Sequence, residues 1–467
     1  MVHVHDDVRD VEGRLAGIVG AGYVRVGADI AEQYGHDEAL AVEPSTPGYL
    51  VRPATTDEVA GIVRLATELG VPVTARGSGS GMSGASTPAP GAILVSFERM
   101  NAVLDVDTEN HLAVAQPGVT LAELDARAAE AGLMYPVYPG EMSASLGGSI
   151  ATNAGGMRAV RYGVTRRHVL GLRVVLGTGE IIRTGGKVVK ASSGYDLTQL
   201  ITGSEGTLAL ITEATVKLVP RPTHQQTLLA PFTDLDTVVR AVPRIVASGL
   251  EPHILEYIDA LTMAAITYTA KLSLGIPDQV RDTAQAYLLV AMENSNAGRL
   301  DEDMARLGDL VVELGALDPY LLAGSAAHKV IEAREKAFWT AKSAGANSIV
   351  DMVVPRAALP ELLDTARKLA QDSGSGVVGC GHAGDGNVHL AVFQADPEIR
   401  HRLLRDMFAA SMRLGGLISG EHGIGREKRS YFAELEEPAT LALLRRIKQA
   451  FDPAGILNPG VLLGNLE

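Results

Sequence analysis

The glycine-rich stretch VPVTARGSGSGMSGAS, which begins at Val71, constrains the fold more than any other part of the chain. Its glycines have the G-x-G-x-x-G spacing of a dinucleotide fingerprint, which requires a helix directly afterwards because the phosphates bind at the helix N-terminus. Pro88 and Pro90 follow instead, and proline is unfavourable inside a helix. The sequence therefore excludes a Rossmann fold here. It predicts a strand entering a loop whose backbone N–H groups surround an anion such as a pyrophosphate, with a flexible surface turn as the alternative.

Two further segments, 139–163 and 200–220, are also dense in glycine. Glycine inside a helix or strand costs roughly 0.5–1 kcal/mol, so three such segments in one region suggest a functional reason. Ser145, Thr152 and Asn153 supply small hydrogen-bonding groups, and few charged groups stand among them. The pattern predicts a large, partly apolar cofactor that is held mainly by the backbone.

Composition narrows the class of protein. The length of 467 residues predicts two or three domains, and 46% hydrophobic with 21% charged residues is typical of globular proteins. The net charge of -14 argues against a nucleic-acid partner. A single cysteine, Cys380, fits a reducing compartment, and the sequence has neither a secretory signal pattern nor about 18 consecutive apolar residues. We expect a cytoplasmic protein without a transmembrane segment, with a peripheral position at the inner face of the membrane left open.

Periodicity and capping residues predict a chain of mixed helices and strands. Thr56 is the expected N-cap of a helix whose apolar residues recur at helical spacing to Leu69. Thr120 and Glu123 form a capping-box pair that opens a second helix. Residues 220–227 are interpreted as a linker. Among the later helices, strands are expected at 286–292, 348–355 and 376–380.

Two histidines, His382 and His389, stand in the motif CGHAGDGNVHL. A metal site, a polar turn and a catalytic loop are all compatible with this pattern taken alone. Imidazole is the commonest protein ligand for metals, but an isolated pair of histidines is more often two polar loop residues. The interpretation depends on what the rest of the chain holds.

Six segments, in order along the chain, resemble the FAD-linked D-2-hydroxyacid dehydrogenases of the vanillyl-alcohol oxidase / p-cresol methylhydroxylase superfamily. That family includes D-lactate dehydrogenases, D-2-hydroxyglutarate dehydrogenases and the glycolate oxidase catalytic subunit. The resemblance implies an α+β fold with a two-subdomain FAD-binding domain at 1–222, a substrate or cap domain with an antiparallel sheet at 223–448, and a C-terminal segment at 449–467 that returns to the FAD domain. The segments are RGSGSGMSG, ASLGGSIATNAGG, GYDLTQLITGSEGTLALITEATVKL, CGHAGDGNVHL, SGEHGIGREK and FDPAGILNPG.

The resemblance also implies that the glycine-dense segments bind FAD. Loop 76–84 contains no histidine that could serve as an attachment point, which favours non-covalent binding. The FAD-binding residues expected on this basis are Arg76, Gly77, Ser78, Gly79, Ser80, Gly81, Gly84, Pro139, Gly140, Ser143, Ser145, Gly147, Gly148, Ala151, Thr152, Asn153, Gly155, Gly156, Glu205, Gly206, Ile211 and Asn458.

Carried over from the family, the two histidines and a glutamate bind a divalent metal, here His382, His389 and Glu421. Two imidazoles and one carboxylate leave an open position, as catalytic zinc sites do. Zinc is the metal we favour, and manganese or ferrous iron also suit these ligands. The resemblance assigns the role of base to His422, and a neutral imidazole is suited to accepting the substrate's hydroxyl proton near neutral pH.

The substrate's carboxylate needs a cation. Many members of the family carry an arginine three residues after a tryptophan, whereas here Lys342 stands three residues after Trp339. The lysine ammonium group is a point charge and lacks the planar guanidinium that makes two parallel hydrogen bonds to a carboxylate. Trp339, Lys342 and Asn387 are the expected substrate residues, although Trp339 is equally compatible with core packing and Asn387 with a turn. Arg334 and Arg356 are further cations, each more typical of a solvated surface charge.

The leading hypothesis is FAD-dependent oxidation of a D-2-hydroxy acid of the D-lactate, glycolate or D-2-hydroxyglutarate type. A flavin-dependent transferase of the alkyl-glycerone-phosphate synthase type, or a phenol oxidase, would not need the metal residues. A non-catalytic accessory subunit of a glycolate oxidase-like complex would lack them. The sequence leaves open the electron acceptor, which could be a quinone, a cytochrome, an electron-transfer flavoprotein or a dye. A homodimer and a multi-subunit complex also both stay open.

Overall fold

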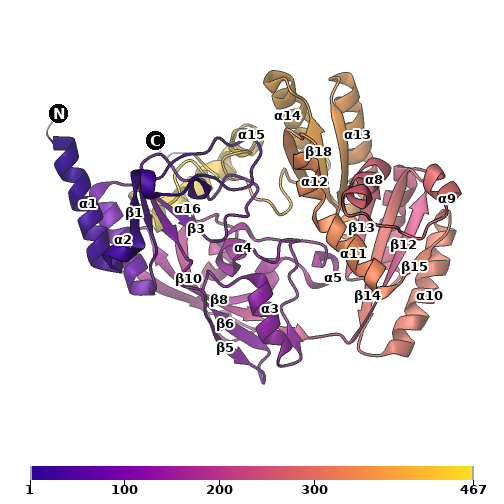
Figure 1. Ribbon diagram of the computed structural model, residues 1–467, viewed down its shortest axis with the longest axis horizontal. Helices are drawn as coiled ribbons and strands as arrows, with labels where there is room; N and C mark the ends of the chain where they lie inside the picture. The colour runs from indigo at the N-terminus through magenta and orange to yellow at the C-terminus, as the bar shows by residue number, and fades with distance from the viewer. Residues whose placement is uncertain (1–2, 465–467) are drawn as a thin grey trace.

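The computed structural model describes residues 3–464, and the strands within that range form four sheets (Figure 1). The sequence predicts no secretory signal at the N-terminus. The first two residues of that segment, Met1 and Val2, lie outside the described residues. The N-terminal sheets occupy one side of the molecule and the largest sheet the other (Figure 1). No helix within 3–464 is both long and apolar enough to cross a membrane. Helices combined with largely antiparallel sheets confirm the α+β class.

The first sheet has β2, β4 and β3 in parallel and β1 antiparallel at its edge. Helix α2 begins after Thr55 rather than after the predicted N-cap Thr56, because Thr55 Oγ1 accepts the Glu58 amide while the Thr56 hydroxyl is buried against Thr212. The described segment 77–92, between β3 and β4, contains no helix, which confirms the exclusion of a Rossmann fold. The elements are α1 (His3–Val19), β1 (Val24–Val26), β2 (Tyr49–Val51), α2 (Thr56–Leu69), β3 (Val73–Arg76) and β4 (Ile93–Ser96).

The second sheet is antiparallel throughout, in the order β5-β6-β10-β8-β9. The predicted capping box is confirmed at the start of α3, where Thr120 and Glu123 exchange hydrogen bonds of 3.1 and 2.9 Å. Strands β7 and β11 form a separate antiparallel sheet of two strands. The elements are β5 (Val103–Asp107), β6 (Leu112–Ala115), α3 (Leu121–Ala129), β7 (Leu133–Met134), α4 (Leu146–Thr152), α5 (Ala159–Tyr162), β8 (Val169–Leu176), β9 (Ile181–Gly185), α6 (Leu197–Ile201), β10 (Ala209–Lys217) and β11 (Val219–Pro220).

The largest sheet, in the order β15-β12-β14-β13-β17-β18-β16, has only antiparallel neighbours among the described strands. The three predicted strands are confirmed as β14, β16 and β17, with ends shifted by one or two residues. The predicted linker 220–227 is wrong in its second half, because β12 starts at His224 and its polar first residues are exposed at the end of the sheet. The strands are β12 (His224–Phe232), β13 (Ile254–Asp259), β14 (Ala286–Asn294), β15 (Tyr320–Leu322), β16 (Ser348–Val353), β17 (Gly376–Gly381) and β18 (Asn387–Phe393).

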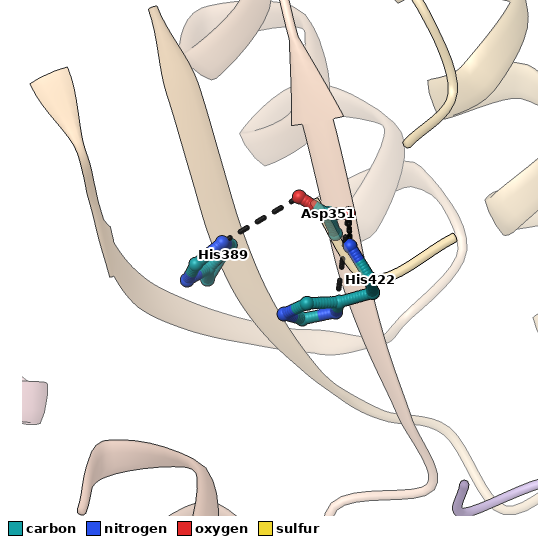
Figure 2. A group of neighbouring side chains, drawn as sticks. All are labelled: Asp351, His389 and His422. Carbon is teal, nitrogen blue, oxygen red and sulfur yellow. Dashed lines mark hydrogen bonds and ion pairs between the residues drawn. The ribbon is translucent and has the colours of Figure 1, made fainter. Parts of the chain in front are cut away.

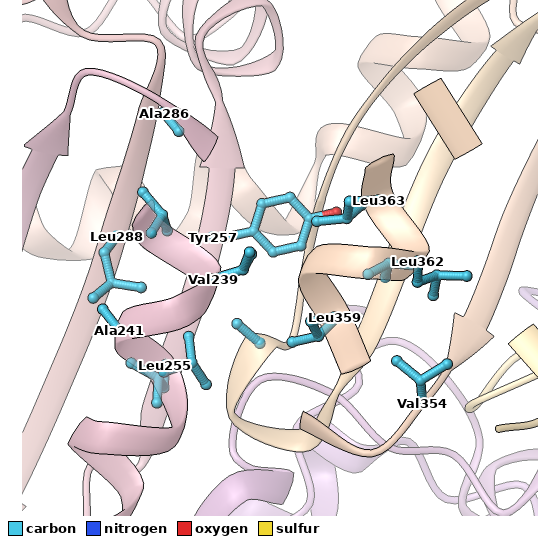
Figure 3. Packing of buried hydrophobic residues seen from close by; sticks show 14 of the residues in the cluster. Val239, Ala241, Leu255, Tyr257, Ala286, Leu288, Val354, Leu359, Leu362 and Leu363 are labelled. Atoms are coloured by element: carbon cyan, nitrogen blue, oxygen red, sulfur yellow. The ribbon is translucent and has the colours of Figure 1, made fainter. Parts of the chain in front are cut away.

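The two faces of this large sheet are covered by different helices. Alternate residues of β14 belong to different cores: Leu288 packs in one apolar cluster and Leu289 in another. Helices α7, α10, α13 and α14 build the first cluster, and Figure 3 shows Leu359 and Leu362 of α13 within it. Helices α8 and α11 contribute to the second. The helices are α7 (Leu235–Ala247), α8 (Ala260–Thr269), α9 (Asp278–Thr283), α10 (Ala297–Glu313), α11 (Gly324–Glu335), α12 (Ala337–Ser343), α13 (Leu359–Asp372) and α14 (Pro397–Arg413).

The C-terminal helices α15 (Arg429–Leu435) and α16 (Pro438–Phe451), yellow in Figure 1, lie back among the N-terminal elements. Lys448 Nζ donates to the backbone oxygen of Thr207 at 2.7 Å and pairs with Asp452. Asn458 continues this contact, because its backbone N–H donates to Val73 O of β3. The division into 1–222, 223–448 and 449–467 stays a prediction, but contact with the N-terminal part is made well before residue 449, because the backbone N–H groups of Ile424 and Gly425 donate to the Glu205 carboxylate.

Candidate active site

Two polar residues, Asp351 of β16 and His389 of β18, stand on one face of the large sheet. Their neighbours in sequence, including Val350 and Leu390, point into the core on the opposite face, because strand side chains alternate. The strand register sets Asp351 directly opposite His389, and Asp351 Oδ1 lies 3.5 Å from His389 Nε2 (Figure 2). An aspartate that interrupts the apolar run SIVDMVVP is the signal that could have revealed this residue from sequence.

Asp351 fixes the loop that carries Glu421 and His422. Its Oδ2 accepts hydrogen bonds from Ser419 Oγ at 2.7 Å and from the backbone N–H groups of Gly420, Glu421 and His422 at 3.0, 3.0 and 2.8 Å. The carboxylate is fully buried, so this loop is the partner that compensates for its desolvation. Figure 2 shows the His422 ring turned beside that of His389, with ring centroids 4.9 Å apart.

The three predicted metal ligands, His382, His389 and Glu421, come together. Glu421 Oε1 lies 3.0 Å from His382 Nε2 and 3.2 Å from His389 Nε2, and one ligand atom from each residue falls within 4.8 Å of the others. His382 Nδ1 is held by Glu256 at 2.7 Å, the carboxylate–histidine arrangement that orients metal-binding imidazoles. Among the described residues, the buried His389 Nε2 has no hydrogen bond of good geometry. This donor set fits a divalent cation.

Buried charges decide the protonation of these imidazoles. Burial would lower the pKa of His382, but Glu256 and Glu421 outweigh it and raise the pKa to about 10. Burial lowers the pKa of His422 to about 4, against the opposing charge of Asp351 and with the help of His389. His422 is therefore neutral at pH 7 and able to accept a proton.

A cleft with about 1250 Å³ of free space, partly open to solvent, runs between the first two sheets and the loop 419–422. Its walls are glycine-dense and mostly uncharged, as a backbone-held cofactor requires. A Cβ on Gly77 would stand 1.9 Å from Ser145 Oγ, so only glycine allows the loop and helix α4 to meet here. The predicted FAD residues that line the cleft are Gly77, Ser78, Gly79, Ser80, Gly81, Pro139, Ser145, Gly147, Gly148, Ala151, Thr152, Gly155, Glu205, Gly206 and Ile211.

The remaining predicted FAD residues, Arg76, Gly84, Gly140, Ser143, Asn153, Gly156 and Asn458, are not among the residues that line this cleft. Arg76 donates to the backbone oxygens of Gln33 and His36, each at 2.7 Å. Asn458 donates to the backbone oxygen of Glu205 at 2.8 Å and so ties the C-terminal segment to the cleft wall. Both residues therefore support the walls of the cleft.

A second cavity, with about 930 Å³ of free space, lies between the large sheet and helices α8 and α12. The cleft and this cavity share four lining residues: Met82, Pro139, Glu421 and His422. The two spaces therefore adjoin at the histidine cluster, which consists of His382, His389, Glu421 and His422. His382 and His389 line the second cavity only. A small molecule in the second cavity and a flavin in the cleft would therefore meet at Glu421 and His422.

The predicted substrate residues are separated from this cavity. Lys342 pairs with Glu38 at 2.7 Å and lies 5.3 Å from the centre of the Trp339 ring, and both residues lie outside the cavity lining. They are three positions apart on α12, so they share the helix face that is turned away. Asn387 is buried and donates to Asp351 Oδ1 at 2.8 Å.

Arg334 differs from the solvated surface charge expected from sequence. It is buried, lines the second cavity and pairs with Glu256 at 2.6 Å, the same carboxylate that holds His382. Arg356 instead donates to the backbone oxygen of Gly384. Arg334 and His382 thus share Glu256 as their partner. The burial of Arg334 depends on this tertiary pairing, which helix periodicity does not reveal.

Two family models match the chain: an FAD binding domain at residues 47–185 and the C-terminal domain of FAD linked oxidases at residues 221–462. The fold and the cleft agree with a flavin-dependent oxidoreductase. The chain belongs to the FAD-linked oxidoreductase family whose members include proteins named D-lactate dehydrogenase, D-2-hydroxyglutarate dehydrogenase and glycolate oxidase subunit.

Three similar proteins illustrate the membership of this family. The uncharacterized FAD-linked oxidoreductase Rv2280 of Mycobacterium tuberculosis is 59% identical, over 98% of this chain and 99% of that protein. A D-lactate dehydrogenase of Anaerostipes hadrus is 37% identical over 94% of each chain. The structure of p-cresol methylhydroxylase with substrate bound has a TM-score of 0.80 at 17% identity, covering 99% of this chain and 98% of that one, which shows a shared fold.

Proposed function

We propose that the protein is an FAD-dependent dehydrogenase that oxidises a D-2-hydroxy acid to the 2-oxo acid. One observation carries the proposal: Glu421 and His422 line both the glycine-rich cleft and the adjoining cavity. A hydroxy acid in the cavity then presents its α-carbon toward the cleft and its hydroxyl to His422. FAD, when bound, supplies the acceptor for the hydride that leaves the α-carbon.

His422 takes the hydroxyl proton. Its backbone N–H donates to Asp351 Oδ2 at 2.8 Å, which holds the residue in place, and its Nδ1 lies 4.0 Å from the same oxygen, within the range of electrostatic attraction but beyond that of a hydrogen bond. The low pKa of His422 keeps the imidazole unprotonated at pH 7. As the proton leaves, the C–O bond becomes a carbonyl and the hydrogen on the α-carbon departs with its electron pair.

His382, His389 and Glu421 are the residues that would hold a divalent metal. Such a metal, zinc by preference, would lower the pKa of the substrate hydroxyl and orient it toward His422. Glu256 orients His382 through Nδ1, the ring nitrogen turned away from Glu421. Asp351 Oδ1 instead lies 3.5 Å from His389 Nε2, the nitrogen that also faces Glu421. Asn387 supports Asp351 and so acts as a positioning residue rather than as a substrate contact.

Arg334 is the cation we propose for the substrate carboxylate, in place of Lys342. Its Nε has no hydrogen-bond partner among the described residues, although it is buried in the cavity wall. The N–H groups of a guanidinium are spaced so that two of them can donate to the two oxygens of one carboxylate. A buried donor without a partner lowers stability until a ligand accepts its hydrogen bond.

Arg334→Lys and Lys342→Met are a matched pair for this assignment. Arg334→Lys keeps the charge beside Glu256 but loses the fork, and KM should rise about 10- to 100-fold, the usual value of a hydrogen bond to a charged group. Lys342→Met should change KM less than about twofold, because an exposed ion pair contributes little. Steady-state kinetics check both, with flavin and metal content as controls for folding. A large rise in KM for Lys342→Met alone would return the carboxylate site to α12.

Turnover with an artificial electron acceptor tests the proposed function. The D enantiomer should yield one equivalent of 2-oxo acid for each two electrons transferred, and the L enantiomer should yield none above background. A transferase or phenol oxidase would turn over neither acid and would not depend on metal. The proposal includes zinc as the metal, non-covalent FAD and a cytoplasmic site of action.

A further inference from the structure

The wall of the second cavity changes from polar to apolar along one strand. In β18, His389, Ala391 and Phe393 alternate with core residues and all line the cavity. His389 is at the histidine cluster, and Phe393 follows four residues later. At about 3.4 Å per residue, the apolar wall extends about 14 Å from the metal ligand along the sheet.

The strand register repeats this change across the sheet. His389 lies opposite Asp351 on one neighbouring strand and opposite the buried Cys380 on the other, whereas Ala391 lies opposite Ile349 and Val378. Ile349, Val378 and Ala391 all line the cavity, so the second row of the floor is apolar from strand to strand. The polarity of the floor therefore falls one row away from the proposed reaction centre.

The opposite wall, formed by helices, is mostly apolar as well, with Thr262 and Thr340 adding two hydroxyl groups. Leu261, Ala265 and Ile266 of α8 line it, and so do Phe338 and Ala341 of α12. Apart from the histidine cluster, the charged residues of the described lining are Arg334 and Glu335. A single cation can hold a single carboxylate. A second carboxylate, as in 2-hydroxyglutarate, would lie in a mostly apolar wall without a cation of its own, which is costly.

We propose, on the basis of the proposed function, that the preferred substrate is a D-2-hydroxy acid with an extended hydrocarbon side chain. The carboxylate and the hydroxyl lie at Arg334 and His422, and the side chain lies along Ala391, Ile349 and Phe393. Glycolate and lactate would leave this apolar surface in water. Each methylene that enters the cavity should raise kcat/KM about fourfold, until the far end at Phe393 is reached.

A chain-length series tests the proposal. The holoenzyme is assayed with glycolate, D-lactate, D-2-hydroxyhexanoate, D-2-hydroxydecanoate and D-2-hydroxyglutarate, and the Kd of the matching 2-oxo acids is measured by calorimetry. We expect kcat/KM to rise at least 30-fold from lactate to hexanoate and Kd to fall in parallel. Two variants should shift the optimum in opposite directions: Ala391→Phe toward shorter acids and Phe393→Ala toward longer ones.

Ala265→Phe and Ala264→Phe are a matched pair that distinguishes filling of the cavity from a folding defect. Both are exposed positions on α8, but only Ala265 lines the cavity. Ala265→Phe should lower the ratio of kcat/KM for decanoate to that for lactate at least fivefold, and Ala264→Phe should leave it unchanged. Flavin reduction that is best with lactate, glycolate or 2-hydroxyglutarate would overturn the inference and leave the proposed function standing. Flavin reduction by none of these acids would overturn the proposed function itself.

Discussion

His422→Ala is expected to lower kcat about 10²–10⁴-fold, the usual contribution of a positioned general base, while FAD and metal content stay as in the wild type. The cofactor should stay because the cleft is built mainly from the glycine-rich segments around Gly79 and Gly147. The metal should stay because its proposed ligands are His382, His389 and Glu421. The loss should therefore fall on the chemical step, which rapid-reaction measurement of flavin reduction isolates.

The matched control for this substitution is His328→Ala, which removes an exposed histidine of α11. That variant should reduce the flavin at the wild-type rate. If His422→Ala lost flavin, metal and thermal stability together, His422 would have a packing role beneath the loop. Near-normal flavin reduction in a variant with normal flavin and metal would remove the base assignment altogether.

His389→Ala is expected to deplete the bound divalent metal and to lower turnover more than 100-fold, because even residues behind metal ligands contribute 10–100-fold to metal affinity. His389 lines only the second cavity, so the variant should retain FAD and its visible spectrum. Elemental analysis of dialysed protein measures the metal, and flavin absorbance measures the cofactor.

Chelation of the wild type provides the complementary experiment. Turnover should be lost on metal removal and return when zinc, manganese or ferrous iron is added back, and the ion that restores it best identifies the metal. Asn347→Ala, at the end of the cavity sheet and away from the cluster, serves as a control that should hold metal normally. Full turnover in a verified metal-free preparation would show that the cluster has a structural role.

The sequence predicted elements whose signals are local. The capping box at Thr120 and Glu123 and the strands at β14, β16 and β17 depend on neighbouring residues, and the structure confirms them. The linker at 220–227 was wrong because the polar start of β12 carries no apolar alternation, although β14 pairs with its whole length. Local pattern does not indicate pairing with a distant strand.

The site shows the same division. The motifs brought out His382, His389, Glu421 and His422, which the structure places together. Asp351 and Arg334 were missed or undervalued because their roles arise from contacts with residues 419–422 and with Glu256, far away in sequence. The phase of α12, which turns Lys342 away from the cavity, is set by packing against α8 and cannot be deduced from the spacing after a tryptophan.

The most direct test of D-2-hydroxy acid oxidation is anaerobic mixing of the purified protein with matched D- and L-2-hydroxy acids, followed by the absorbance of the oxidised flavin. The measurement needs no knowledge of the electron acceptor, because it ends at the reduced flavin. We expect a D acid to bleach the flavin in a single turnover, its L enantiomer to leave the flavin oxidised, and His422→Ala to slow the bleaching by the same factor as kcat. Bleaching by the L enantiomer, or no bleaching by any hydroxy acid in metal-replete protein, would contradict the proposed reaction.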